Sequence, residues 1–311
     1  MQRILVTGGA GYLGSVLVPA LLAEGFEVTV IDNFMYGQMS LLDVCNNPNL
    51  TIIQGDVRDK ALLARLIKGA DYILPLAAIV GAPRCNRDPV SAQTINYDAI
   101  KLKLELRDKE QRIIFPTTNS GYGIGQSGIF CTEETPLNPI SFYGRLKAQA
   151  EAAVLDSKNA ITLRLATVFG ISPRMRLDLL INDFTYRAIN DGFVVLFEAH
   201  FKRNYIHVRD VAKAFLHCIR HFEIMKDEPY NVGMSTANLS KIELCEEIKK
   251  HIPSFYFVEA AVGEDPDKRN YIVSNAKIEK TGFLPDYDLS AGVRELIKGY
   301  QVIKRNQFAN V

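Results

Sequence analysis

Tyr143 and Lys147 stand four residues apart, and their types and spacing could support proton transfer. On a helix this spacing brings a phenol and an ammonium group to the same face. A free tyrosine has a pKa of about 10, too high for a base at neutral pH. A neighbouring cation lowers that pKa because it stabilises the phenolate. The pair therefore predicts a tyrosine acid/base, tuned by Lys147, that exchanges a proton with a substrate hydroxyl.

A run of hydroxyl and glycine residues precedes this pair. Residues 117–123 read Thr-Thr-Asn-Ser-Gly-Tyr-Gly and follow a predicted strand, Ile113–Pro116. Ligands of a parallel sheet bind beyond the carboxyl ends of its strands. We therefore expect the hydroxyls of this run to lie at the carboxyl edge of the sheet, where ligands bind.

A glycine-rich turn near the start of the chain predicts a dinucleotide site. Residues 7–14 read Thr-Gly-Gly-Ala-Gly-Tyr-Leu-Gly, between a predicted strand and a predicted helix. Glycines let the backbone approach a pyrophosphate at the positive end of the helix. Asp32, at the end of the second predicted strand, suits the ribose hydroxyls and disfavours a 2′-phosphate, which favours NAD over NADP. Asp56 and Val57 are expected around the adenine; alternatively, their segment is a turn that caps the next helix.

Short apolar runs alternate with helical patterns through the first half of the chain, as in a doubly wound parallel α/β sheet of the Rossmann type. The predicted strands are Ile4–Thr7, Glu27–Ile31, Thr51–Gln54, Tyr72–Leu76, Ile113–Pro116 and Ala160–Leu165. The predicted helices are Tyr12–Glu24, Lys60–Ile67, Pro89–Leu106, Phe142–Leu155, Leu177–Asn190, Val208–Phe222 and Ser240–His251. We expect a dinucleotide-binding domain over residues 1–168 and a smaller α/β substrate lobe over 169–311, with a soft boundary because the chain partly returns to the sheet.

Composition narrows the classes of partner. Lys and Arg number 36 against 35 Asp and Glu, so no concentrated basic surface predicts a nucleic-acid or membrane partner. The five cysteines form no C-x-x-C pair, and His217 and His221 have no third ligand nearby, so no metal site is expected. The chain opens directly into a strand and has no long apolar run, and the cytoplasm is the expected location.

Taken together, these motifs resemble the extended short-chain dehydrogenase/reductase family, in its NAD-dependent nucleotide-sugar epimerase/dehydratase branch. The resemblance covers essentially the whole chain, from the glycine turn to the run at residues 203–210, Arg-Asn-Tyr-Ile-His-Val-Arg-Asp. It implies that Tyr143 is the acid/base on a sugar hydroxyl, that Thr118 bonds the same oxygen, and that Lys147 also holds the cofactor ribose. Asn96 would support the strand ends. The residues expected around tightly bound NAD are Gly8, Gly11, Tyr12, Leu13, Asp32, Asn33, Asp56, Val57, Leu76, Ala77, Ala78, Tyr143 and Lys147.

Departures from the family pattern limit the chemistry. Family members that remove water from the sugar carry a Thr-Asp-Glu sequence in the catalytic loop. At the corresponding positions this chain has Asn119 and Ser120 after Thr118. Neither residue takes up a proton at neutral pH, so dehydration is not expected. Thr167 lies where galactose-type 4-epimerases carry an Arg-Tyr-Phe-Asn sequence. This difference disfavours simple epimerisation without excluding it. The residues needed to transfer a hydride at C-4 of a nucleotide-linked sugar, Thr118, Tyr143 and Lys147, are present.

Four loops are similar to those of a small group in the family, the bacterial GDP-D-glycero-α-D-manno-heptose 4-dehydrogenases of capsule biosynthesis. They are residues 81–86, 119–125, 169–178 and 263–270. The resemblance implies oxidation of this GDP-linked sugar to its 4-keto form, with a keto acid as a candidate co-substrate for NADH reoxidation. The residues expected to bind substrate are Val80, Gly81, Thr118, Asn119, Ser120, Thr167, Arg174, Arg176, Asn182, Arg203 and Arg269. The arginines among them are expected to contact the diphosphate.

Two other functions stay open from the sequence. One is an NAD-dependent 4-epimerase for a UDP- or GDP-linked sugar, and the other is a non-catalytic NAD-binding regulator. The resemblance further implies a homo-oligomer, a dimer or a dimer of dimers, joined through the helix that bears Tyr143 and the helix before it.

Overall fold

A seven-stranded parallel sheet organises the larger part of the chain in the computed structural model, which describes residues 1–126, 128–260 and 269–303. In spatial order its strands are β11 (Glu228–Val232), β7 (Ala160–Leu165), β5 (Arg112–Thr118), β4 (Tyr72–Pro75), β1 (Arg3–Thr7), β2 (Glu27–Asp32) and β3 (Leu50–Gln54). Every neighbouring pair in this sheet is parallel. The chain order reverses between β1 and β4, which is where doubly wound folds bind their ligands. The predicted Rossmann-type fold is confirmed.

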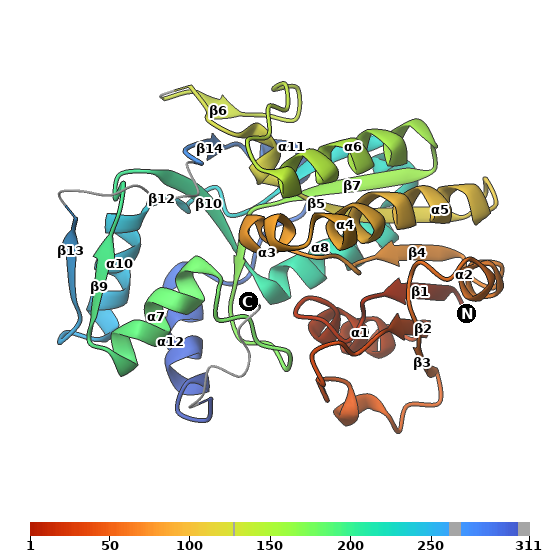
Figure 1. Cartoon of the computed structure of the whole chain (residues 1–311), viewed down its shortest axis with the longest axis horizontal. Coiled ribbons are helices and arrows are strands. Elements are labelled where there is room, and N and C mark those ends of the chain that lie inside the picture. Colours follow the sequence, from red (N-terminus) through yellow and green to blue (C-terminus); the bar gives the residue numbers. More distant parts are fainter. Residues whose placement is uncertain (127, 261–268, 304–311) are drawn as a thin grey trace.

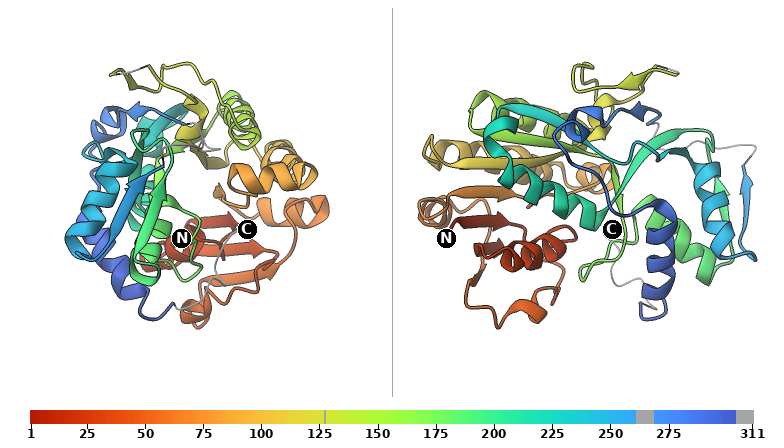
Figure 2. Two further views of the ribbon diagram at one scale, coloured as in Figure 1. Left: turned by 60° about the vertical axis from the view of Figure 1, so that its left-hand side comes forward. Right: turned by 180° about the vertical axis from the view of Figure 1, so that it is seen from behind.

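Helices cover both faces of this sheet (Figures 1 and 2). Helices α2 (Lys60–Ile67), α5 (Ala99–Leu106) and α6 (Phe142–Asp156) pack side by side on one face, and α1 (Gly14–Ala23) packs beside α8 (Val208–Arg220) on the other. Strand β7 is buried along its whole length, because a central parallel strand is covered on both sides. One apolar core therefore lies under α1 and α8, and another under α2, α5 and α6.

Several predicted elements match the structure and one is corrected. The strand Ala160–Leu165 and the helix Lys60–Ile67 have the predicted bounds. The single helix expected over Pro89–Leu106 is instead divided into α4 (Pro89–Gln93), a π-helical turn η2 (Thr94–Asp98) and α5. Within that turn the buried Asn96 side chain forms hydrogen bonds with the backbone nitrogen and the carbonyl oxygen of Ile79. Single π-helical turns are often found at functional sites.

A smaller lobe lies beyond the carboxyl edge of the large sheet (Figure 1). Its strands are β8 (Thr167–Phe169), β9 (Phe193–Leu196), β10 (Lys202–His207), β12 (Asn238–Ser240) and β13 (Tyr256–Glu259), and its helices are α7 (Leu180–Asn190), α10 (Lys241–His251) and α12 (Leu289–Gly299). These elements share one apolar core. Strand β11 and helix α8 follow residue 168 yet belong to the large sheet and its cover. The division into a dinucleotide-binding domain and a substrate lobe at residues 168/169 therefore remains a proposal about which part binds which ligand.

The remaining elements are short connections. They are η1 (Leu42–Val44), α3 (Ala82–Arg87), η3 (Asn119–Tyr122), β6 (Phe130–Cys131), α9 (Phe222–Met225), β14 (Ile272–Val273) and α11 (Ala276–Glu279). Among the described residues, no helix has the length and apolar character needed to cross a membrane.

Candidate active site

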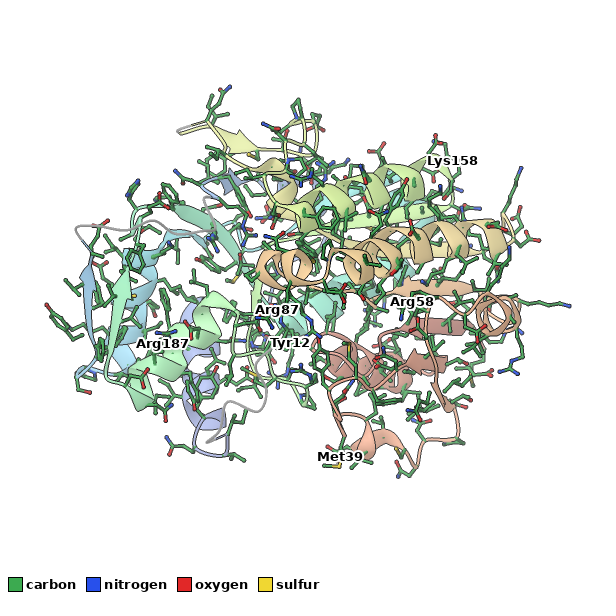
Figure 3. All side chains as sticks on the ribbon, in the orientation of Figure 1. Tyr12, Met39, Arg58, Arg87, Lys158 and Arg187 are labelled. Carbon is green, nitrogen blue, oxygen red and sulfur yellow. The ribbon has the colours of Figure 1, made fainter. Side chains whose placement is uncertain are left out.

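A cavity of about 320 Å³ lies at the carboxyl edge of the large sheet, between it and the smaller lobe. All of the residues expected around NAD line it, as do Thr118 and most of those expected to bind substrate. Figure 3 places Tyr12 between the two lobes, and its hydroxyl donates to the carbonyl oxygen of Gly170 at 2.7 Å. The predicted cofactor residues, with Tyr143 and Lys147 among them, therefore share one cavity with Thr118.

The glycine turn leaves no room for side chains. Gly8 has a φ of +74°, and a Cβ added there would lie 2.5 Å from the backbone nitrogen of Ala77. A Cβ on Gly14 would lie 2.5 Å from the carbonyl oxygen of Gly9, so strand end and helix start pack backbone against backbone. Gly11 lines the cavity at the start of α1, where a pyrophosphate is stabilised by the helix dipole.

Asp32 closes the adenosine end of the cavity. Its carboxylate accepts hydrogen bonds from the backbone nitrogens of Ala10 at 3.0 Å and Phe34 at 2.9 Å. Burial raises the pKa of Asp32, while these bonds and the charge of Arg174 oppose the rise. The side chain is 8% exposed, so it meets a ligand from a fixed position.

Arg174 lies nearer this end than the sequence suggested. Its guanidinium carbon is 4.1 Å from the centre of the Tyr36 ring, and both residues line the cavity. Arg84, from α3, donates to the Tyr36 hydroxyl at 2.5 Å. Helix α3 and two loops therefore meet over the adenosine side, and Tyr36 is a cavity residue that sequence reasoning missed.

Tyr143 lies in the first turn of α6. Ser141 caps this helix by accepting a hydrogen bond from the backbone nitrogen of Gly144 at 3.0 Å. Burial raises the pKa of Tyr143 to about 12, and the positive charges that oppose the rise are those of Arg176 and Arg269. The sequence predicts Lys147 in that role, and the structure adds Arg176 and Arg269 as cations that favour the phenolate.

Lys147 is 5% exposed and faces the sheet. Its Nζ donates to the carbonyl oxygen of Pro116 at 3.0 Å and lies 4.6 Å from the centre of the Phe115 ring. Burial lowers the pKa of Lys147 to about 8. Both contacts are with β5, so the amine is fixed at the cavity wall beside the strand that ends in Thr118.

A chain of polar contacts leads from Arg269 to Thr118. The Oγ1 of Thr118 and the Oγ of Ser120 are 2.9 Å apart, and Arg269 donates to the same Ser120 oxygen. Arg176 lines the cavity too, and its Nη2 donates to the Oδ2 of Asp178 at 2.5 Å in an ion pair. Two guanidinium groups thus face the part of the cavity that contains Tyr143.

Four of the predicted site residues do not line the cavity formed by the described residues. Asn96 instead bonds Ile79, which does line the cavity, at 2.8 and 2.7 Å. Asn182 accepts from the nitrogen of Gly170 and donates to the carbonyl oxygen of Arg176, so it supports the wall from behind. Asn119 and Arg203 are buried, at 1% and 5% exposure. Of the predicted loop at residues 263–270, positions 263–268 lie outside the described residues.

Other residues of the site carried no separate signal in the sequence. Tyr271 lines the cavity, and Glu151 and Arg164 lie behind it as a buried ion pair with atoms 2.7 Å apart. Contacts between residues distant in the sequence create these positions, and no local pattern encodes them. Among the described residues no cluster of His, Cys, Asp or Glu could hold a metal ion.

The residues present fit a dinucleotide. The glycine turn, the buried carboxylate of Asp32 and the buried amine of Lys147 all line one cavity, and they suit the pyrophosphate, the adenosine ribose and the nicotinamide ribose of NAD respectively. The residues that the sequence predicts around NAD all line this cavity, and they would hold the cofactor there.

Comparisons with known proteins agree with this geometry. The family model described as NAD dependent epimerase/dehydratase family matches residues 4–233. A low-salt glycan biosynthesis protein of Haloferax volcanii is 28% identical, over 96% of this chain and 98% of its own length. A UDP-glucose 4-epimerase of Lactobacillus helveticus is also 28% identical, with 86% and 87% covered.

Solved structures show the same fold. A UDP-glucose 4-epimerase of Thermotoga maritima, solved with UDP-glucose, has a TM-score of 0.84 at 24% identity and covers 98% of this chain and 100% of its own. A dTDP-glucose 4,6-dehydratase of Bacillus anthracis, solved with NAD, has a TM-score of 0.83 at 23% identity, with 99% of each chain covered. On its fold, its site and its family match, the chain is an enzyme of the NAD dependent epimerase/dehydratase family, with NAD as its cofactor.

Proposed function

We propose that this enzyme oxidises C-4 of a nucleotide-linked sugar, and that the sugar is GDP-D-glycero-α-D-manno-heptose, taken to its 4-keto form in capsule polysaccharide biosynthesis. One observation carries the reaction type. The only carboxylates that line the cavity among the described residues are Asp32 and Asp56, and both belong to the adenosine end. Loss of water from a sugar needs an acid and a base beside the reacting carbons. Hydride removal needs only a base for the hydroxyl proton.

Tyr143 is the base in this proposal. Its phenolate takes the proton of the C-4 hydroxyl, and Thr118 holds the same oxygen through its own hydroxyl. NAD, when bound, supplies the acceptor for the C-4 hydride. Burial raises the pKa of Tyr143 and so disfavours the phenolate. The positive charges of Arg176 and Arg269, which line the same cavity, act in the opposite direction and favour the phenolate.

The same two arginines support a diphosphate-linked substrate. A guanidinium fork matches the oxygens of a phosphate, and both groups face the substrate end of the cavity. The preference for GDP and for the heptose rests on the loops at residues 81–86, 119–125 and 169–178. Repeated net oxidation requires reoxidation of NADH, for which a keto acid is our candidate. We further expect two copies to associate through α5 and α6.

The test is an assay of net oxidation. Enzyme loaded with NAD is mixed with GDP-D-glycero-α-D-manno-heptose, GDP-mannose or UDP-glucose, while absorbance at 340 nm is followed and the sugar products are identified. We expect NADH and a 4-keto sugar in equal amounts from the GDP-heptose alone. Tyr143→Phe should abolish this product and retain NAD binding. Tyr186→Phe, on α7 and away from the cavity wall, is the matched control.

Other outcomes assign other functions. A C-4 epimer formed without net NADH would make the chain a 4-epimerase, and oxidation of UDP-glucose in preference would overturn the GDP assignment. If no sugar of the panel reacted although NAD bound, the proposed substrate and the proposed net oxidation would both fail.

A further inference from the structure

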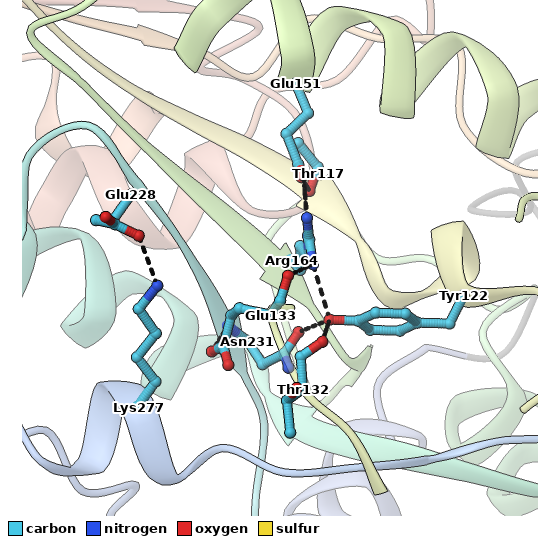
Figure 4. Close-up of polar contacts among 9 residues, drawn as sticks. All are labelled: Thr117, Tyr122, Thr132, Glu133, Glu151, Arg164, Glu228, Asn231 and Lys277. Atoms are coloured by element: carbon cyan, nitrogen blue, oxygen red, sulfur yellow. Dashed lines mark hydrogen bonds and ion pairs between the residues drawn. The ribbon is translucent and has the colours of Figure 1, made fainter. Parts of the chain in front are cut away.

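A buried polar network lies behind the catalytic residues and joins the elements that carry them (Figure 4). We define it by six residues: Thr117, Tyr122, Glu133, Glu151, Arg164 and Asn231. Each is at most 9% exposed, and they come from β5, η3, α6, β7, β11 and the segment after β6. The proposed reaction has no proton or hydride step for any of them.

The ion pair at its centre connects α6 to the sheet. One carboxylate oxygen of Glu151 accepts from Nε and Nη2 of Arg164 at 2.9 and 2.7 Å. The other accepts from the hydroxyl of Thr117 at 2.6 Å. Glu151 lies one helical turn after Lys147 and two turns after Tyr143, on the same side of α6. Its carboxylate thus ties the catalytic helix to the residue next to Thr118.

The other side of Arg164 holds the loop that follows Thr118. Its Nη1 donates to the Tyr122 hydroxyl and to the carbonyl oxygen of Glu133, both at 3.0 Å. The Tyr122 oxygen is also 2.7 Å from the Oδ1 of Asn231. Tyr122 ends the η3 turn, and that turn carries Ser120, the contact of Arg269.

These contacts fix positions more than they add stability. Burying an ion pair costs desolvation that its attraction only partly offsets, so such a pair is weak evidence for stability. Successive strand residues face opposite sides, so a hydroxyl anchored at Thr117 sets the direction of Thr118. Transfer of a hydride and a proton depends on small distances, and a displacement of about 1 Å can lower a rate about 100-fold.

We propose that this buried polar network is a positioning device for the proposed reaction. Glu151, Arg164 and Tyr122 hold Thr118 and the η3 turn at a fixed place relative to Tyr143. The inference rests on the proposed function, because it names the step that the network serves. None of the three residues lines the cavity, so each acts through the residues in front of it.

Single-hydroxyl deletions test the proposal with little change in shape. Thr117→Val and Tyr122→Phe should lower kcat for the GDP-heptose about 10- to 100-fold, with KM and NAD affinity close to wild type. Tm should fall as well, because each deletion leaves a buried partner without a hydrogen bond. Thr117→Ser keeps the hydroxyl and should restore kcat. Thr162→Val is the matched control, because Thr162 is a buried threonine of the neighbouring strand β7 whose hydroxyl has no hydrogen-bond partner within the described residues.

A second measurement does not depend on the substrate. Hydrogen–deuterium exchange of the NAD-bound enzyme should be faster at residues 118–124 in Thr117→Val and Tyr122→Phe, and unchanged in Thr162→Val. Unchanged exchange, or a kcat loss that Thr162→Val shares, would overturn the network's role. A loss confined to NAD affinity or Tm would do the same. Failure of the proposed function looks different, since the wild type would then oxidise no sugar while the exchange results still decide the network.

Discussion

Lys103 offers a quantitative test of the electrostatics beneath the cavity. This lysine of α5 is 1% exposed, and its Nζ donates to the carbonyl oxygen of Ala99 at 3.0 Å. Burial lowers the pKa of Lys103 from 10.5 to about 7, with a further contribution from the charge of Lys147. At about 1.4 kcal/mol for each pH unit, this difference costs the folded state roughly 5 kcal/mol when the amine is charged.

The sign of the pH dependence follows from this lowered pKa. Between pH 7 and 10.5 the unfolded chain binds more protons at this site, so its contribution to the unfolding free energy rises with pH. Lys103→Met removes the charge and keeps an unbranched side chain. The variant should therefore be more stable than wild type by up to about 5 kcal/mol at pH 7 and below, with a difference that vanishes above pH 10.5.

Urea unfolding of the cofactor-free protein at pH 6.5, 8 and 9.5 measures this difference. Lys101→Met is the control, because Lys101 lies on the same helix and is exposed. It should leave the unfolding free energy almost unchanged at each pH. A Lys103→Met variant that is less stable than wild type at pH 6.5, or whose advantage does not decline with pH, would refute the reasoning.

Three further predictions concern the cavity wall. Gly8→Ala should weaken NAD binding at least tenfold in a fluorescence titration, because its Cβ would lie 2.5 Å from the Ala77 nitrogen; unchanged affinity would contradict the backbone packing. Asp32→Asn should weaken NAD binding about 10- to 100-fold, as expected for loss of a charge-assisted hydrogen bond, and narrow the preference over NADP; retained preference would move ribose recognition elsewhere. Asn96→Ala should lower the unfolding free energy by about 2 kcal/mol in urea through loss of the two bonds to Ile79; an unchanged value would show that these bonds are replaced.

Local patterns predicted the large sheet and the cofactor end of the site well. The glycine turn and Asp32 depend on neighbours in sequence, since a strand, a tight turn and a helix start follow one another. Tyr143 and Lys147 were predictable for the same reason, because four residues separate them on one helix. Each signal lies within a short segment, so one sequence is enough to read it.

Positions set by distant contacts were not predictable. Strand β5 continues to Thr118 because Thr117 and Thr118 pair with Arg164 and Leu165, residues far along the chain. Arg174 is predicted to bind the substrate diphosphate, and the structure adds a contact with the Tyr36 ring that the sequence did not predict. Nothing in the sequence around these residues encodes such a meeting of loops.

The central claim is that Tyr143 removes a hydroxyl proton while the hydride leaves C-4. Single-turnover absorbance at 340 nm, with NAD-loaded enzyme and GDP-D-glycero-α-D-manno-heptose carrying deuterium at C-4, tests it directly. The account predicts a primary isotope effect on NADH formation, deuterium on the nicotinamide, and no signal from Tyr143→Phe. NADH formed without deuterium, or at an undiminished rate in Tyr143→Phe, would contradict it.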